Sequence, residues 1–133
     1  MGNLGSYLPT DKCDYDCICR LKTLKPEELQ MIIPELLEWV QDINWPIAPK
    51  IIEILLPLDR ILLPQIKGIL LSGDYEWIQN CLWHMVKELK TETIIELKNE
   101  LVMLSKSMDP QFIEYEIPQI CKDIMSEHSI NCE

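Results

Sequence analysis

Apolar residues recur at intervals of three and four along most of the chain, the spacing that places them on one face of an α-helix. In residues 75–89 this stripe consists of Ile78, Leu82, Met85, Val86 and Leu89. Stripes of the same period predict helices over residues 11–24, 26–40, 46–57, 58–71, 75–89, 92–106 and 110–126. The alternation of apolar and polar residues that marks a β-strand is too sparse to support a sheet. The pattern therefore predicts an all-α protein.

Prolines interrupt several of these helices at internal positions. Pro34, Pro64 and Pro118 lie inside the predicted segments, where a proline removes a backbone hydrogen bond and kinks or divides the helix. Pro26, by contrast, stands at the first position of its helix, where its missing N–H is not needed. We therefore expect the helices that contain Pro34, Pro64 and Pro118 to be kinked or split.

A short motif, Asp-x-x-Trp, recurs near the start of alternate helices. Asp42-x-x-Trp45 is followed by Asp74-x-x-Trp77 and, more loosely, by Asp109-x-x-Phe112. We expect each aspartate to cap the helix that follows by accepting a hydrogen bond from its first turn, with Asn44 as an alternative cap to the first aspartate. The tryptophans of the first two copies occupy equivalent positions, so we expect both to pack in the core between repeats.

The spacing of this motif, a little over thirty residues, is typical of arrays of helical hairpins, in which each unit covers the apolar face of its neighbour. The linkers are short, so successive helices should be antiparallel neighbours. The sequence therefore predicts a HEAT-like right-handed stack of three helical hairpins, preceded by a short N-terminal helix. We expect a single helical-repeat domain over residues 1–133, with a flexible N-terminus at residues 1–10.

The chain is acidic, with a formal net charge of −10 over 133 residues. Such a charge repels phosphate backbones, so we expect no nucleic-acid partner. It attracts basic proteins instead. Because 47% of the residues are hydrophobic and 26% are charged, the composition is typical of a folded globular domain.

No catalytic motif stands out from the sequence. The two histidines, His84 and His128, belong to no paired metal motif, and the chain has no glycine-rich phosphate loop or nucleophile elbow. We therefore expect no enzyme activity, no bound metal and no cofactor. An alternative to a non-catalytic protein is a helical-repeat enzyme of the DNA-repair type. That alternative needs a basic groove, and the charge of the chain argues against it.

Three of the six cysteines, Cys13, Cys17 and Cys19, lie near the start of the chain. No signal-peptide pattern precedes them, so we expect a cytoplasmic protein with reduced thiols. A helix would place Cys13 and Cys17 on one face, which leaves a thiol or metal sensor as a second alternative. The most apolar stretch, residues 51–63, is too short and too interrupted to span a bilayer, so we expect no membrane partner.

Three segments carry a resemblance to a known family. They are the Trp-x-x-Asp-x-Asn-Trp-Pro-x-Ala run at residues 39–48, the segment Leu-Leu-Ser-Gly-Asp-Tyr-Glu-Trp at 70–77, and Leu-Pro-x-Asp-Lys at 8–12. With these segments the chain resembles an uncharacterised bacterial family, a domain of unknown function with HEAT-like helices. The resemblance implies the helical-repeat fold and carries no assigned activity. The cysteine-rich start departs from the family's pattern.

The residues that remain for binding are aromatic and acidic. Trp39 and Trp83 are less constrained by the apolar stripes than the other tryptophans, and tryptophan is common at binding hot spots. Glu92, Glu96 and Glu100 are four residues apart on one predicted helix, so we expect them to form an acidic ridge. We therefore predict a non-catalytic protein–protein interaction module with a basic protein partner. A specific version is an immunity-type protein that blocks a basic toxin.

Overall fold

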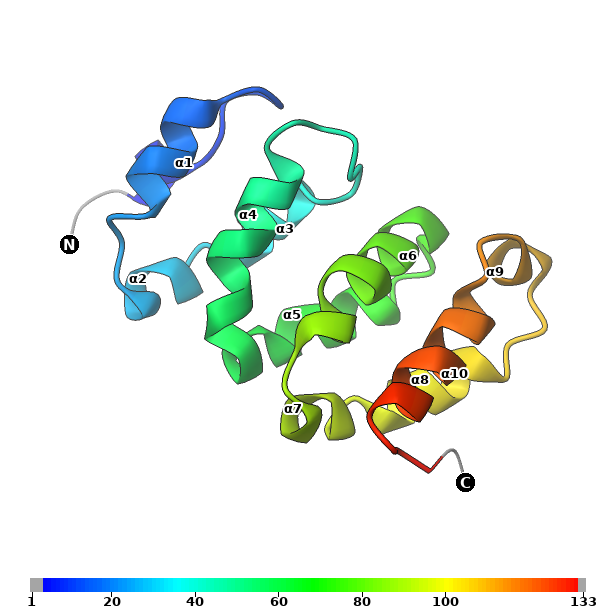
Figure 1. Cartoon of the computed structure of the whole chain (residues 1–133). Helices are drawn as coiled ribbons and strands as arrows, with labels where there is room; N and C mark the ends of the chain where they lie inside the picture. The colour runs from blue at the N-terminus through cyan, green and yellow to red at the C-terminus, as the bar shows by residue number, and fades with distance from the viewer. Residues whose placement is uncertain (1–3, 132–133) are drawn as a thin grey trace. The chain divides into compact units, whose positions relative to one another are not determined.

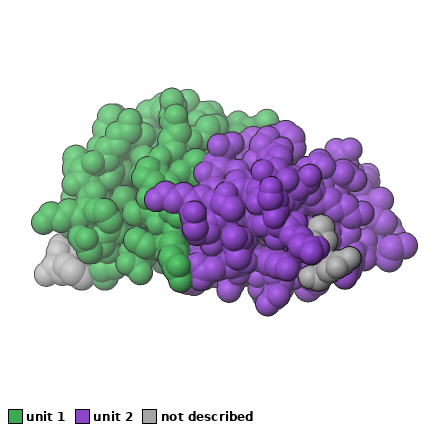
Figure 2. Space-filling model, turned by 60° about the horizontal axis from the view of Figure 1, so that its bottom comes forward, with its two compact units in different colours: residues 1–62 green, residues 63–133 purple. Residues whose placement is uncertain are grey.

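The computed structural model describes residues 4–131, and every regular element in that part of the chain is a helix (Figure 1). The all-α prediction is therefore confirmed. The chain divides into two compact units, unit 1 (Met1–Leu62) and unit 2 (Leu63–Glu133), which Figure 2 shows in different colours. None of the helices in residues 4–131 has the length and hydrophobicity that crossing a bilayer requires.

Unit 1 consists of short helices joined by tight turns. They are η1 (Leu4–Tyr7), α1 (Tyr15–Leu21), α2 (Pro26–Gln30), α3 (Ile33–Glu38), α4 (Ala48–Leu55) and η2 (Leu56–Leu62), where η denotes a 3-10 helix. Helix α4 contacts α1, α3 and η2 and so lies at the centre of this unit. Within residues 1–10, for which the sequence predicts a flexible start, η1 is a regular element, and residues 1–3 lie outside the described part.

Two helices of unit 1 begin with a buried apolar residue followed by a proline. In α3 the pair is Ile33-Pro34, and in α4 it is Ala48-Pro49. Proline is tolerated there because the first N–H groups of a helix have no partner within it. Both preceding residues are fully buried, so they anchor the helix starts in the core. The prediction that Pro34 divides the segment 26–40 is confirmed, since α2 ends before it and α3 begins at it.

The core of unit 1 follows the apolar periodicity of the sequence. Ile51 and Leu55, one turn apart in α4, are completely buried, and α3 contributes Leu36 and Leu37. Burying an aliphatic side chain of this size stabilises the fold by about 2 kcal/mol. The stripe of each helix therefore determines which of its faces turns inward.

The loop between α3 and α4 departs from the expected helix start. Asp42 Oδ1 accepts a hydrogen bond from the Asn44 N–H at 2.9 Å and closes a turn within the loop, while α4 begins only at Ala48. The expectation that Asp42 or Asn44 caps α4 is therefore wrong, because Ile47 occupies the cap position and the N–H that Asp42 bonds lies in the loop before it. The Ile47 N–H instead donates to the Lys12 carbonyl oxygen at 3.1 Å, which ties the loop to the segment before α1.

Unit 2 is built around its last helix. Its elements are α5 (Leu63–Leu70), α6 (Tyr75–His84), η3 (Val86–Glu88), α7 (Thr91–Ile95), α8 (Lys98–Ser105), α9 (Pro110–Glu114) and α10 (Ile117–Glu127). Helix α10 contacts α8, α6 and α9. Its apolar stripe, which includes Ile117, Cys121 and Ile124, is buried against them.

The turns that open α6 and α9 follow the sequence signals. Gly73 ends the preceding segment with a φ of 79°, a conformation that favours glycine. Asp74 then caps α6 by accepting a hydrogen bond from the Trp77 N–H at 3.2 Å. Asp109 caps α9 through the Gln111 N–H at 2.9 Å. Both predicted caps are therefore confirmed.

Four of the predicted helical segments are divided in the structure, and a proline signals the division in only two of them. The segments 58–71, 75–89, 92–106 and 110–126 form η2 and α5, α6 and η3, α7 and α8, and α9 and α10, respectively. Pro64 and Pro118 lie in the first turns of α5 and α10, as expected from the effect of proline on a helix. The breaks at Met85 and between Ile95 and Lys98 contain neither proline nor glycine, so the sequence does not signal them.

At the corner between α9 and α10 the chain turns, so the apolar side of α9 does not continue into the buried side of α10. Glu116 adopts a left-handed conformation with a φ of 58° and turns the chain. Ile113, which the sequence places in one apolar stripe with Ile117, is 50% exposed, whereas Ile117 is fully buried. The expectation that Ile113 faces the core is wrong, because the phase of the stripe is lost across the corner.

Candidate functional site

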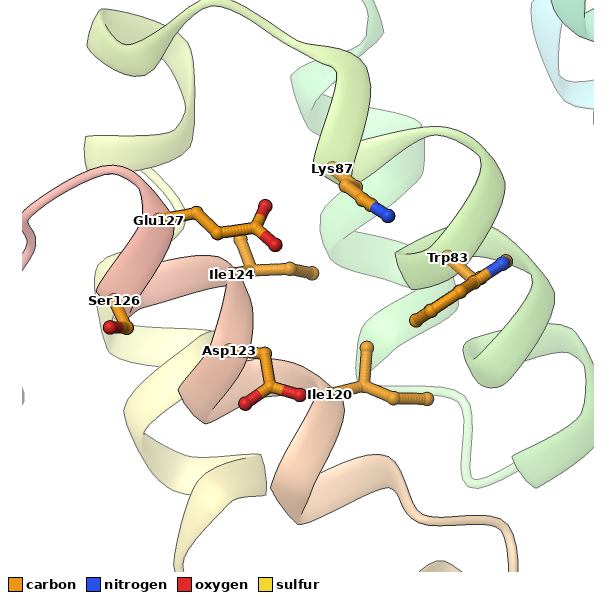
Figure 3. Close-up of a pocket in the computed structure, with 7 residues that line it drawn as sticks. All are labelled: Trp83, Lys87, Ile120, Asp123, Ile124, Ser126 and Glu127. Carbon is orange, nitrogen blue, oxygen red and sulfur yellow. The ribbon is translucent and has the colours of Figure 1, made fainter.

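A pocket of about 200 Å³ lies within unit 2, between the end of α6 and the second half of α10 (Figure 3). Trp83 of α6 and Lys87 of η3 form one wall. Asp123 and Glu127 of α10 belong to the opposite wall. The pocket therefore combines an aromatic ring with charges of both signs.

Trp83 presents its indole ring to this pocket. The residue is 49% exposed, although the same helix buries Ile78 and Leu82 completely on its other face. The Nζ atom of Lys87 lies 4.3 Å from the centroid of the ring, within the range of a cation–π contact. A spacing of four residues brings the two side chains to one side of the chain. The contact contributes about 0.5–1 kcal/mol at an exposed position.

The carboxylates of Asp123 and Glu127 face Trp83 and Lys87 across the pocket (Figure 3). They are four residues apart in α10 and share one face of the helix. Gln119 Nε2 donates a hydrogen bond of 2.9 Å to Asp123 Oδ1 and orients that carboxylate. In the part of the chain that the structure describes, neither carboxylate forms an ion pair with Lys87. The negative charge of this wall is thus available to a ligand.

Apolar side chains form the floor of the pocket. Ile120 and Ile124 lie between the two walls in Figure 3 and are only 8% and 2% exposed. A floor of this kind excludes water and lowers the local dielectric constant, which strengthens charge interactions above it. The stem of a long cationic side chain can lie on such a floor while its head reaches the carboxylates.

Contacts from the α9–α10 corner hold the start of α10 against α6, away from the residues that line the pocket. The Gln79 Nε2 atom donates to the Tyr115 carbonyl oxygen at 2.9 Å, and the Tyr115 hydroxyl donates to Glu76 Oε1 at 3.2 Å. The rings of Tyr115 and Tyr75 also pack, with centroids 4.8 Å apart. Desolvation and then the charge of Glu76 raise the pKa of Tyr115 above its ordinary value, so the phenol keeps the proton that it donates.

The C-terminal end of α10 has its own anchor. His128 Nδ1 shares a hydrogen bond of 2.8 Å with Thr91 Oγ1 at the start of α7. At the end of α6, burial and then the charge of Lys87 lower the pKa of His84 below its ordinary value. His84 is therefore neutral near physiological pH and adds no second cation beside Lys87.

The size and chemistry of the pocket restrict its ligands. Sites for cofactors and drug-sized molecules usually enclose about 300–1,000 Å³, which is more than this pocket offers. No group of three or more potential metal ligands occurs among residues 4–131. Two carboxylates above an apolar floor, beside an indole ring, are suited to one positively charged side chain.

Residues 7–125 match the model of a family described as Domain of unknown function (DUF5071). The chain belongs to this family. The expected membership of an uncharacterised domain family is therefore confirmed. No curated protein matches the chain. The match includes Trp83, Lys87 and Asp123 and ends two residues before Glu127, so most of the pocket lies within the DUF5071 domain.

The two tryptophans predicted to bind a partner have different surroundings. Trp83 lies in the pocket. Trp39 follows the last residue of α3 in unit 1, where it is half-buried and its ring centroid lies 5.7 Å from that of Trp45. Trp45 and Trp77, expected in the core, are also only half-buried. Both side chains are therefore partly exposed, and the expectation that they pack in the core between repeats stays a prediction.

The acidic ridge does not form as the sequence predicts. Glu92 is exposed in α7, Glu96 follows the last residue of that helix, and Glu100 lies in α8. Because the helix is interrupted between α7 and α8, the three carboxylates do not lie along one continuous helix. Glu96 and Glu100 are half-buried, and the Oε1 atom of Glu100 is enclosed by protein without a hydrogen-bond partner among the described residues.

The N-terminal thiols are also arranged differently from the prediction. Cys13 precedes α1, so it does not share a helix face with Cys17. Cys13 and Cys19 are exposed, whereas Cys17 is buried and its Sγ donates to the Tyr7 carbonyl oxygen at 2.9 Å. Burial and then the charge of Asp14 raise the pKa of Cys17 to about 11, which keeps this thiol protonated and unreactive near neutral pH.

Sequence reasoning does not identify Lys87, Asp123 or Glu127 as site residues. The spacing of four residues places Lys87 on the same side as Trp83, and Glu127 on the same side as Asp123. This spacing is the only local signal for the pairs. The sequence does not indicate that α10 returns to the end of α6. The pocket therefore arises from the packing of two segments that are distant along the chain.

Proposed function

We propose that unit 2 binds a protein partner that carries positive charge, and that the pocket at Trp83 is the contact site. The observation that supports this proposal is a half-exposed indole ring facing two carboxylates that have no ion-pair partner in the described residues. Exposed tryptophans in pockets are frequent hot spots of protein interfaces. The protein acts in this proposal as a non-catalytic interaction module.

The overall charge supports the same partner. With a net charge of −10, the chain attracts basic proteins over distances longer than any direct contact. The carboxylates of Glu92, Glu96 and Glu100 add to this field. The field speeds the encounter, whereas the pocket provides the contact that keeps the partner bound.

A specific form of this proposal is an immunity-type protein that blocks a basic toxin in the cytoplasm. The acidic charge and the small size of the chain support it. We further propose that the helices form a HEAT-like right-handed stack of three hairpins. The recurrence of the Asp-x-x-Trp motif and the division of the chain into short successive helices support this arrangement.

The proposed function is tested by photo-crosslinking in cells that make the protein. The photoreactive amino acid p-benzoylphenylalanine replaces Ser126, an exposed residue that lines the pocket. In a matched control it replaces Gln111, an exposed residue of α9 outside the pocket. We expect position 126 to give a covalent adduct with one basic protein, and position 111 to give none with that protein.

The adduct from position 126 is expected to depend on the pocket and on charge. Trp83→Ala should abolish it, and Asp123→Lys should reduce it. The captured protein, once identified and purified, should bind more weakly as salt is added, because salt screens the attraction between opposite charges. The proposal is contradicted if position 126 gives no adduct, or if the yield of the adduct is unchanged by Trp83→Ala.

A further inference from the structure

Lys87 marks the position that a cation occupies in this pocket. Its Nζ atom lies 4.3 Å from the centroid of the Trp83 ring, and no ion pair joins it to Asp123 or Glu127 in the described residues. Building on the proposed function, we propose that the partner inserts a single arginine side chain into this pocket. Its guanidinium displaces Lys87 from the indole ring and forms hydrogen bonds with Asp123 and Glu127.

The dimensions of the pocket favour a single side chain. A volume of about 200 Å³ accommodates one long side chain and excludes a helix or a folded segment. The buried surfaces of Ile120 and Ile124 form the floor, so the aliphatic stem of an arginine can pack there while its charged end remains near the mouth.

The arrangement of acceptors favours arginine over lysine. Two carboxylates on successive turns of α10 offer acceptors at two separate positions. A guanidinium presents five N–H donors in one plane, so it can bond both carboxylates while its face stacks on the indole ring. An ammonium group is a point charge with stronger hydration, and it cannot combine stacking with two separate carboxylate contacts in the same way.

Lys87 increases this preference because it competes for the ring. It is part of the same chain, so its ammonium group is always close to the indole. A lysine from a partner would replace one ammonium group with another and would gain little from the ring. An arginine gains the planar stacking and the paired hydrogen bonds that Lys87 does not make. Lys87 therefore discriminates against lysine-bearing ligands.

The proposal is tested with short peptides and the purified full-length chain. The peptides share glycine and serine flanks and differ at one central residue, which is arginine, lysine or citrulline. Citrulline has nearly the shape of arginine without its charge. Binding is followed by NMR through the indole N–H signals of the four tryptophans. The signal of Trp83 is assigned by its loss in Trp83→Phe.

We expect the arginine peptide to shift the Trp83 indole signal while the signals of Trp39 and Trp45 stay in place. The lysine peptide should bind at least about threefold more weakly, because it lacks the paired hydrogen bonds. The citrulline peptide should cause no shift, because neutral citrulline is not attracted to the carboxylates. Equal binding of the lysine and arginine peptides, or no shift with arginine at tens of millimolar, overturns the proposal.

Variants of the pocket identify the partner groups. Asp123→Asn and Glu127→Gln should each weaken the arginine peptide about threefold, as expected for the loss of one partly exposed charge pair. Glu114→Gln removes an exposed carboxylate of α9 outside the pocket and should leave the affinity unchanged. Lys87→Gln should strengthen binding about threefold, because it removes the competing cation.

If Lys87→Gln binds the arginine peptide more weakly than the natural chain does, the proposal is also overturned. Such a loss means that Lys87 contacts an acidic group of the ligand. The peptide results are also independent of the crosslinking results. A partner captured at position 126 in a Trp83-dependent manner, together with no arginine preference, leaves the proposed function in place and rejects the arginine. Failure of the crosslinking with a clear arginine preference rejects the protein partner and retains the chemistry of the pocket.

Discussion

Trp45 in unit 1 and Trp83 in unit 2 illustrate two environments for the same side chain. Trp45 lies in the loop before α4, and its ring centroid is 5.7 Å from that of Trp39. Trp83 packs against no other aromatic ring among the described residues. The ammonium group of Lys87 lies over its ring, and the ring faces a pocket with two carboxylates. The ring of Trp45 packs against another ring of its own unit, whereas the ring of Trp83 lines a pocket together with charged side chains.

This difference teaches that exposure alone does not identify a binding residue. Trp39, which the sequence predicts as a partner-binding residue, and Trp45 are both half-buried. Their mutual packing indicates that they stabilise the loop between α3 and α4. The proposed binding function of Trp83 rests on its neighbours, because a cation that enters the pocket would meet both an aromatic ring and two carboxylates.

The largest effect on stability is expected at the aromatic pair. Trp45→Ala should lower the free energy of unfolding by about 2 kcal/mol, since it removes a half-buried ring and its contact with Trp39. Trp83→Ala should lower it by less than about 1 kcal/mol, because that ring is already half in water. Chemical denaturation measures both values. Equal losses in the two variants would mean that Trp83 is as structural as Trp45.

The apolar core of both units could be predicted from periodicity. Ile51 and Leu55 in unit 1 and Ile78 and Leu82 in unit 2 are all completely buried, as their spacing indicates. Ile113 is the exception, because a left-handed residue shifts the helix phase between it and the rest of its stripe. Periodicity reports the face of one continuous helix, so it fails where a left-handed residue turns the chain between two helices.

The candidate site could be predicted only in part. Trp83 was identifiable because the apolar stripe of its helix does not use it. Lys87, Asp123 and Glu127 were not, because their role depends on the return of α10 to α6. The Tyr115 contacts that fix this return join residues 36 and 39 positions apart, and no local pattern signals them.

Buried cysteines in both units make the stability of the fold depend on pH. Burial raises the pKa of Cys81 and of Cys121 in unit 2 to about 12 from the ordinary thiol value of 9.0, and that of Cys17 in unit 1 to about 11. The unfolded thiols ionise first as pH rises. Their contribution to stability is therefore complete below pH 9.0 and is lost as the pH rises towards about 12.

Cys81→Ala should consequently reduce the alkaline loss of stability. Between about pH 8 and about pH 10, the free energy of unfolding of the natural chain should fall by about 1 kcal/mol more than that of this variant. Cys13→Ala changes an exposed thiol and should follow the natural chain. Denaturant titrations at the two pH values test this, and parallel behaviour of all three proteins would show that burial of Cys81 does not govern the alkaline loss.

The first two copies of the Asp-x-x-Trp motif should respond differently to the same substitution. Asp74→Ala removes the cap of α6 and should lower the free energy of unfolding by about 1 kcal/mol. Asp42→Ala removes only a turn within a loop and should lower it by about half as much. Thermal melts compare the two variants. A larger loss for Asp42→Ala would contradict the assignment of a helix cap to Asp74 and of a loop turn to Asp42.

The smallest effect is expected from the acidic residues outside the pocket. Glu92→Lys should slow association with the partner by about twofold at low salt and leave dissociation unchanged, because an exposed charge acts mainly on the encounter. The slowing should disappear at physiological salt, where charges are screened beyond about 8 Å. Stopped-flow measurements separate the two rates. A faster dissociation in this variant would instead indicate direct contact at Glu92.

The affinity of the crosslinked partner for Trp83→Ala and Trp39→Ala, measured by calorimetry on the purified proteins, tests the assignment of the binding site most directly. Circular dichroism establishes that both variants are folded at the temperature used. We predict that Trp83→Ala weakens binding by about thirtyfold, as expected for a hot-spot tryptophan, while Trp39→Ala changes it by less than about twofold. An equal loss in both variants, or a larger loss for Trp39→Ala, would contradict the assignment of the contact to the pocket of unit 2.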